Sequence, residues 1–154
     1  MLLRRQSRQR RATTLVEVAF VALICFTLMF AIFEYGRYVF TRQVMENAAR
    51  TGARVAVVEP TSYLSSTDAN SDVGAAITTA MANIGVQNMN WTIYGCDSSG
   101  NNNGDWTTTQ FGNDLAVQID ADLPLMFPLF NFIKPSSSNS IHISVKVMMR
   151  SEAN

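Results

Sequence analysis

The sequence Ala12-Thr13-Thr14-Leu15-Val16-Glu17 opens the longest apolar part of this chain, which continues from Val18 to Phe33 without a charged residue. A helix over residues 13–33 would be about 32 Å long, enough to cross a hydrocarbon core of about 30 Å. No second run in the sequence is both as long and as apolar, so we expect one transmembrane helix. A charged side chain inside such a helix costs roughly 2.5–3.5 kcal/mol. Glu17 is therefore expected to be functional.

The net charge of zero hides a strong asymmetry at the N-terminus. No acidic residue precedes Glu17, whereas the leader contains five arginines, Arg4, Arg5, Arg8, Arg10 and Arg11. The positive-inside rule predicts that residues 1–12 form a basic cytoplasmic leader and that residues 34–154 lie outside the membrane. A nucleic-acid-binding arm is the alternative explanation of these arginines, and we disfavour it because topology already accounts for the charge.

A cleaved secretory signal is the main alternative to a membrane anchor. The apolar segment is longer than the usual h-region of about 7–15 residues, and its end at Ile32-Phe33-Glu34-Tyr35 has no small-x-small cleavage site. Arg10-Arg11 is reminiscent of twin-arginine export, but the residues after the pair do not support it and Glu17 interrupts the apolar segment. We therefore expect a retained, single-pass anchor.

The helical pattern continues beyond the span, because residues 34–58 contain no proline and Pro60 is the first natural stop. Small and apolar side chains recur here at three- and four-residue spacing, namely Met45, Ala48, Ala49, Gly52 and Ala56. This stripe permits helix packing, either onto the protein's own domain or against the backbone of another subunit. Glu46, Arg50 and Arg54 form an i, i+4 series elsewhere on the helix.

Residues 59–154 are predicted to form a small exported domain of the α+β class. After a polar loop (Thr61–Asn70), we expect a short helix from Asp72 to Ile84, capped by Ser71 or Asp72 and ended by Gly85. Three segments then alternate apolar and polar residues, around 89–93, 115–121 and 141–147. They indicate an antiparallel sheet of about three strands laid against the long helix.

Two connections in this domain differ in character. Cys96–Asp105 is rich in glycine and polar residues, so we expect it not to pack, and its alternate oxygen-bearing side chains resemble a calcium loop only faintly. Leu123–Ile133 is strongly apolar around Pro124 and Pro128. It is interpreted, in order of preference, as a lid on the core, a membrane-surface contact or a partner contact.

The sequence lacks the residues that enzyme chemistry needs. His142 is the only histidine, no Cys/His spacing forms a zinc site, and no Gly-Lys-Ser/Thr sequence forms a phosphate loop. Asp114, Asp120 and Asp122 lie on or beside one strand and are interpreted as solvated. We therefore expect no catalytic, cofactor or metal site, and Cys25 and Cys96 are expected in different compartments.

The start of the chain resembles a type IV prepilin signal. A small residue, Ala12, precedes the candidate cleavage point, Thr13 follows it, and a glutamate, Glu17, stands at the fifth position after it. The resemblance implies that a prepilin peptidase cuts before Thr13 and leaves the span in the mature protein. Glu17 would then neutralise the new terminus of a neighbouring subunit and set the assembly register. Glycine is usual where this sequence has Ala12.

More narrowly, the chain resembles the TadE-like family of pseudopilins of the tight-adherence (Flp) pilus system. The resemblance rests on Arg10-Arg11-Ala12-Thr13-Thr14-Leu15-Val16-Glu17, on Phe33-Glu34-Tyr35-Gly36-Arg37, on Asn47-Ala48-Ala49-Arg50-Thr51-Gly52-Ala53-Arg54, and on a final strand followed by Arg150-Ser151-Glu152. It implies a minor subunit of the bacterial inner membrane that acts in pilus assembly and adhesion. Its partners would be other pilin-like subunits, the peptidase, the assembly platform and the bilayer. A signal-anchored exported binding module is the alternative function.

Overall fold

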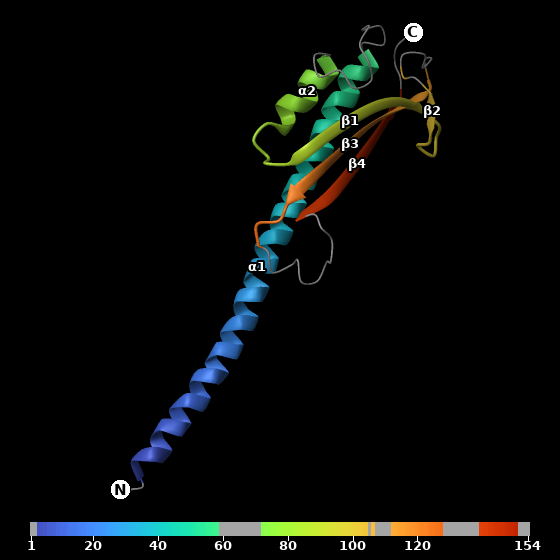
Figure 1. The fold of residues 1–154 in the computed structure, drawn as a ribbon. Coiled ribbons are helices and arrows are strands. Elements are labelled where there is room, and N and C mark those ends of the chain that lie inside the picture. Colours follow the sequence, from blue (N-terminus) through green and yellow to red (C-terminus); the bar gives the residue numbers. More distant parts are fainter. Residues whose placement is uncertain (1–2, 59–71, 105, 107–111, 128–138, 151–154) are drawn as a thin grey trace. The chain divides into compact units, whose positions relative to one another are not determined.

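A computed structural model describes residues 3–58, 72–104, 106, 112–127 and 139–150, with side chains from residue 13 onward. The elements are two helices, α1 (Leu3–Val58) and α2 (Asp72–Met81), and four strands, β1 (Gln87–Cys96), β2 (Asn102–Gly104), β3 (Asp114–Pro124) and β4 (Ser140–Arg150) (Figure 1). The predicted α+β class is confirmed. The expected stop at Pro60, the loop at 61–70, the Ser71 cap, residues 128–133 of the apolar loop and the Ser151-Glu152 ending lie outside the described residues.

The chain divides into two compact units, Met1–Arg37 and Tyr38–Asn154. α1 contributes to both, and its residues from Tyr38 onward cluster with the sheet. They do so because one face of this part of the helix is buried in the same core as α2 and the strands.

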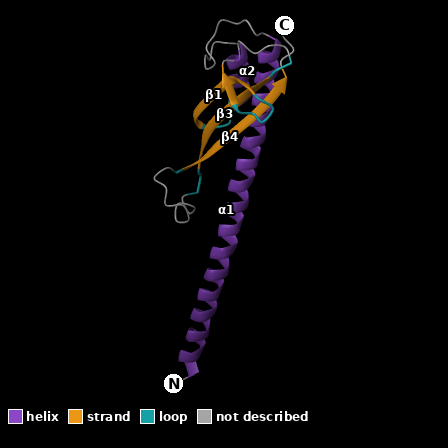
Figure 2. Cartoon of the chain, turned by 90° about the vertical axis from the view of Figure 1, so that its right-hand side faces the viewer, coloured by secondary structure: helices purple, strands orange, loops and turns teal. Residues whose placement is uncertain are grey.

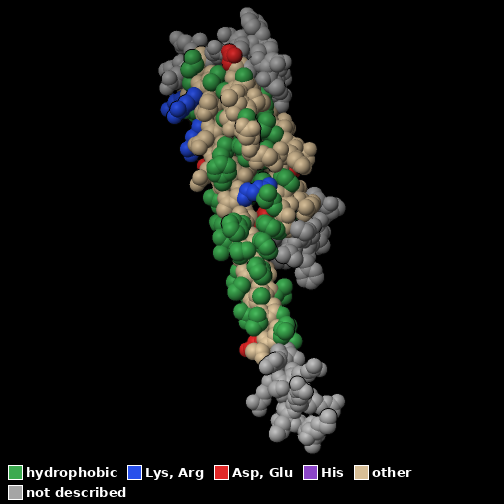
Figure 3. Space-filling view, turned by 90° about the vertical axis from the view of Figure 1, so that its left-hand side faces the viewer, with side chains coloured by type: hydrophobic (Ala, Val, Ile, Leu, Met, Phe, Trp, Pro, Cys, Tyr) green, Lys and Arg blue, Asp and Glu red, His purple; other side chains and the backbone are tan. Residues whose placement is uncertain are grey.

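In the first unit, α1 begins earlier than expected, at Leu3 instead of Thr13. Residues 3–12 contain no proline or glycine, and arginine, glutamine and leucine are good helix formers, so the leader continues the helix. The helix ends at Val58, as the sequence predicts. Its apolar segment is hydrophobic over most of the face visible in Figure 3.

The second unit is built around one hydrophobic core between α1, α2 and the sheet (Figure 2). Met45, Ala48, Ala49 and Ala53 of α1 are fully buried, and so is Ile77 of α2. The sheet contributes a row of fully or almost fully buried side chains from its central strand, Leu115, Val117, Ile119, Ala121 and Leu123. The alternation seen in the sequence therefore points these residues towards the helices.

The sheet is antiparallel, with strand order β2-β1-β3-β4. β3 is central, pairing with β1 through Trp91↔Ile119 and with β4 through Val145↔Ile119. Because side chains alternate across a strand, Asp120 and Asp122 lie on the outer face. The three predicted strands are present, and β4 forms one edge of the sheet.

Two local details differ from the expectations. β2 is a strand that the sequence did not predict, pairing with β1 at Gly95↔Gly104 and Cys96↔Asn102. α2 ends at Met81 instead of Ile84, because Asn83 takes a φ of 75° and the chain leaves helical geometry before Gly85, whose φ is 68°.

Candidate functional site

Glu17 lies in a segment of α1 whose side chains are exposed on all sides of the helix. Leu15 is 72% exposed and Val18 is 64% exposed, and the most hydrophobic 18-residue window of this helix has a mean hydropathy of 2.6 with none of it buried. Glu17 itself is exposed. A helix that is apolar around its whole circumference belongs in a membrane or in the core of an assembly. Among the described residues, α1 is the one helix long and apolar enough to cross a membrane.

The few polar groups of this segment are compatible with a membrane. The Thr27 hydroxyl donates a hydrogen bond of 2.8 Å to the Leu23 carbonyl oxygen one turn earlier, which satisfies its donor without water. Phe26 and Phe30 stack along one side, with their ring centroids 6.4 Å apart. Between Thr13 and Phe33, Glu17 is the one charged residue.

The predicted processing residues lie within the same helix. Thr13 is exposed, and Ala12 is part of α1, although its side chain lies outside the described residues. Thr13 and Glu17 are four residues apart, which corresponds to about 6 Å along a helix axis. A terminus at Thr13 would thus stand about one helical turn from the Glu17 carboxylate.

A second acidic residue of α1, Glu34, is buried in a way that the sequence did not reveal. Its side chain is 7% exposed, and its Oε1 lies 3.7 Å from Arg37 Nη1. Their i, i+3 spacing on a helix could have predicted this ion pair. The pair lies in the Phe33-Glu34-Tyr35-Gly36-Arg37 segment, directly after the apolar run.

The predicted helix-packing residues face the protein's own core. Ala48 and Ala49 are fully buried, Ala56 is 1% exposed, and Gly52 is buried beside Ile77 of α2. In this structure the stripe of small residues lets α2 approach α1 closely. It leaves none of these four positions on the surface.

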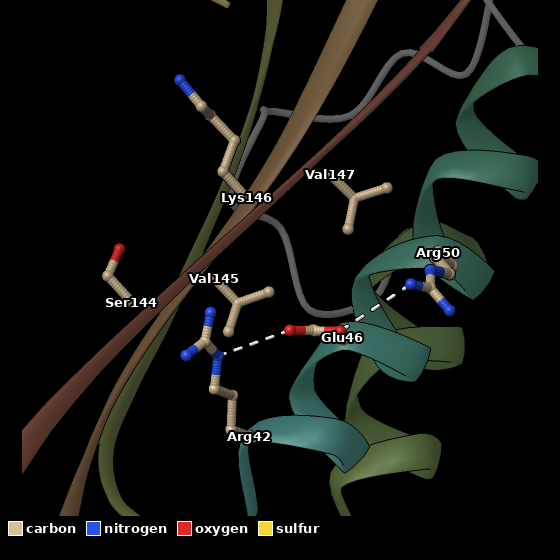
Figure 4. Close-up of a pocket in the computed structure, with 7 residues that line it drawn as sticks. All are labelled: Arg42, Glu46, Arg50, Ser144, Val145, Lys146 and Val147. Carbon is tan, nitrogen blue, oxygen red and sulfur yellow. Dashed lines mark ion pairs between the residues drawn. The ribbon is translucent and has the colours of Figure 1, made fainter. Parts of the chain in front are cut away.

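A groove lies between α1 and the edge strand β4 in the second unit (Figure 4). It has a volume of about 280 Å³ and is lined by Arg42, Glu46 and Arg50 from the helix and by residues 144–147 from the strand. Glu46 bridges the two arginines, with Oε1 3.4 Å from Arg42 Nε and Oε2 3.7 Å from Arg50 Nη2. The sequence pattern predicted the Glu46–Arg50 pair but missed Arg42, which lies four residues before Glu46.

The outer face of the sheet carries a hydrogen-bonded polar cluster. Asp122 accepts a 2.9 Å hydrogen bond from the Asn88 side chain and lies 3.0 Å from His142 Nδ1. These two contacts hold the pKa of Asp122 below its usual range, and the hydrogen bond from Asn88 contributes most. His142 is largely exposed, as predicted. Within the described part of the chain, no three His, Cys, Asp or Glu residues are grouped so that they could hold a metal ion.

The polar connection after β1 packs against the sheet, so the expectation that it would not pack is wrong. Asp97 Oδ1 accepts hydrogen bonds from the backbone N–H groups of Ser99 and Asn101, at 2.9 and 2.8 Å. The contacts with Asn101 are the main reason that the pKa of Asp97 is lowered. Lys146 of β4 donates a 2.8 Å hydrogen bond to the Gly100 carbonyl oxygen, which ties the turn to the outer face of the sheet.

Comparison with known proteins found a family match for part of the N-terminal helix. Residues 12–54 match the family described as TadE-like protein, so the matched segment includes Ala12, Thr13 and Glu17. Searches of curated proteins and of solved structures found no match. The resemblance seen in the sequence is thus confirmed over these residues, which make up less than a third of the chain.

Proposed function

We propose that this chain is a minor pilin-like subunit of a tight-adherence pilus, or of a related secretion machine, and that it acts in assembly and adhesion. It is inserted in the bacterial inner membrane by α1, with the basic leader in the cytoplasm and the C-terminal domain outside. The observation that carries the proposal is the placement of Glu17, the one charged residue in an apolar helical segment exposed on all sides, within the matched residues 12–54.

The energetic argument concerns the partner of Glu17. A carboxylate in hydrocarbon costs roughly 2.5–3.5 kcal/mol, and removing one member of a buried ion pair costs about 3–5 kcal/mol. Both costs favour an assembly in which Glu17 faces a positive group. No other residue between Thr13 and Phe33 is charged. Once the leader with Arg10 and Arg11 is removed, the positive group comes from the new terminus or from another subunit.

Cleavage before Thr13 would create that positive group. A prepilin peptidase acting between Ala12 and Thr13 leaves an ammonium at Thr13, about one turn from Glu17. Pairing Glu17 with the Thr13 ammonium of a neighbouring subunit fixes the axial offset between the two helices. Ala12 replaces the usual glycine but is small enough for the peptidase site.

The proposal implies several partners. Other pilin-like subunits cover the exposed apolar side chains of α1, the peptidase removes the leader, and an inner-membrane assembly platform moves the subunit. Until assembly, the bilayer covers the same side chains, in keeping with their exposure in the single chain. No part of the proposal requires this chain to bind nucleotide or metal.

The mature N-terminus tests the proposal directly. We expect mass spectrometry of the protein from native membranes to find a chain that begins at Thr13. Ala12→Gly should be processed at least as well, and Ala12→Leu should stay uncleaved, which separates the peptidase from unspecific proteolysis. An intact leader would instead favour the signal-anchored binding module, and a start beyond Phe33 would mean a secreted domain.

A further inference from the structure

The edge strand β4 lines a groove together with two arginines of α1. β4 spans Ser140–Arg150 and pairs with β3 on one side, and no described strand lies on its other side. It contains no proline. Such an edge is a ready template for another strand unless it is protected.

The groove gives access to this backbone. In Figure 4 the side chains of Val145 and Val147 point towards α1, whereas those of Ser144 and Lys146 point to the other side of the strand. Because Ser144 and Lys146 still line the groove, they contribute their main chain to it. The groove thus combines an apolar floor, an accessible strand edge and the guanidinium groups of Arg42 and Arg50.

The charges of the groove favour an acidic occupant. Arg42 and Arg50 are each more than half exposed, and the single carboxylate between them, Glu46, pairs with both. A guanidinium has five N–H donors, so each arginine retains donors for a second carboxylate. The volume of about 280 Å³ is small for a drug-sized ligand but suits a few side chains of a peptide.

We infer that this groove binds an extended acidic segment of a partner protein, which adds to β4 as a further strand and places two carboxylates on Arg42 and Arg50. The spacing supports this arrangement. The two arginines are eight positions apart on α1, or about 12 Å along the axis. Residues four apart on a strand point to the same side and are about 13 Å apart. The matching pattern is acid-x-apolar-x-acid, with the apolar residue against Val145 and Val147.

The described outer strands of a second copy do not match the groove. The strands with a free edge are β4, β2 and the part of β1 that β2 does not cover, and none of them contains an acidic residue. Pairing two copies of β4 would instead bring their arginines together without added carboxylates. Because these described strands cannot supply the two carboxylates, we assign the acidic segment to a different polypeptide, and this inference holds whether or not the chain assembles through Glu17.

A designed peptide tests the inference. Purified full-length protein in an uncharged detergent is titrated into fluorescein-labelled Thr-Glu-Thr-Val-Thr-Glu-Thr, and binding is followed by fluorescence anisotropy. We expect saturable binding that weakens about tenfold in Arg42→Gln and in Arg50→Gln, since each removes a charge-assisted contact. Arg54→Gln is the matched control and should bind as the wild type does, because Arg54 lies on α1 but does not line the groove.

Changes in the peptide keep the test independent of any folding defect in the variants. Replacing both glutamates by glutamine should weaken binding to the wild-type protein about tenfold, and replacing the threonines by proline should abolish it, because proline cannot donate the ladder hydrogen bonds. Equal binding of the proline peptide, or full displacement by equimolar inorganic phosphate, would reduce the groove to a simple anion site and overturn the inference. Absence of saturable binding by the acidic peptide at millimolar concentration would overturn it as well.

Discussion

Gly52 of α1 and Ile77 of α2 are so close that a side chain cannot be added between them without movement. A Cβ placed on Gly52 would lie 2.7 Å from Ile77 Cγ1 and 2.8 Å from its Cδ1. Ile77 is fully buried, so it has little room to move away. The absence of a side chain at position 52 is therefore what lets α2 pack directly on α1.

Gly52→Ala should destabilise the C-terminal unit by about 1–2 kcal/mol. Overpacking a core costs about 1–3 kcal/mol, and the better helix propensity of alanine returns up to about 1 kcal/mol. The measurement is urea unfolding of the full chain in detergent, followed by tryptophan fluorescence. In an Ile77→Ala background the same change should cost much less, because the colliding atoms are gone.

Gly36→Ala is the matched control for this experiment. Gly36 belongs to the same helix, but a Cβ added there would have nothing within 4 Å. We therefore expect no loss of stability and a gain of up to about 1 kcal/mol from helix propensity. A similar loss in both variants would show that α1 needs its glycines for backbone flexibility, and the explanation by close packing would fail.

Glu17→Leu separates assembly from simple anchoring. Removing the carboxylate should favour bilayer insertion, by less than the roughly 2.5–3.5 kcal/mol of a charge at the helix centre because Glu17 lies near the start of the span. It also leaves the proposed ion pair at Thr13 without its acid. We expect normal or increased amounts of the protein in the membrane fraction and a strong loss of surface pili and of adhesion. Glu17→Asp keeps the charge and should retain partial assembly. Wild-type piliation in the leucine variant would contradict the register role.

Cys96 should react slowly with thiol reagents in the folded protein. The residue is 6% exposed, and burial, helped by the nearby Asp114 carboxylate, raises the pKa of its thiol. Less thiolate is therefore present at a given pH, and the thiolate is the reactive form. In Cys25→Ala, alkylation by iodoacetamide at pH 8 should be at least about tenfold slower than in 8 M urea. Equal rates would mean that the end of β1 opens readily.

The features that followed from the sequence are those encoded by residue periodicity. The apolar run of α1, the uninterrupted helix to Val58 and the three long strands all have local patterns of apolar residues. The fold class could be predicted for the same reason. The small residues at 48, 49, 52 and 56 predicted packing but not the packing partner, because Ile77 is brought to Gly52 only by the tertiary fold.

The features that did not follow depend on contacts between distant segments. β2 consists of three exposed residues. Its sequence has no apolar alternation, and its pairing with Gly95 and Cys96 forms only in the folded sheet. The turn at Gly100 packs because Lys146, 46 positions away, donates to its carbonyl group. The groove is likewise formed by Arg42 and Arg50 of α1 with a strand about a hundred residues later. None of these pairings is visible in a local window.

The titration of Asp122 should report the polar cluster on the outer face of the sheet. The pKa of Asp122 is lowered in the folded state, chiefly by Asn88 and then by His142. The ionised carboxylate therefore stabilises the fold above pH 3.8, the usual pKa of this group. This stabilisation is lost as the pH falls through the lower pKa of the folded state. Asn88→Gly removes the amide and suits the φ of 50° at this position. In this variant the carboxyl carbon of Asp122, followed by NMR, should titrate at a higher pH than in the wild type. His142→Ala should move it in the same direction but less far. An unchanged titration in Asn88→Gly would mean that the hydrogen bond does not persist in solution.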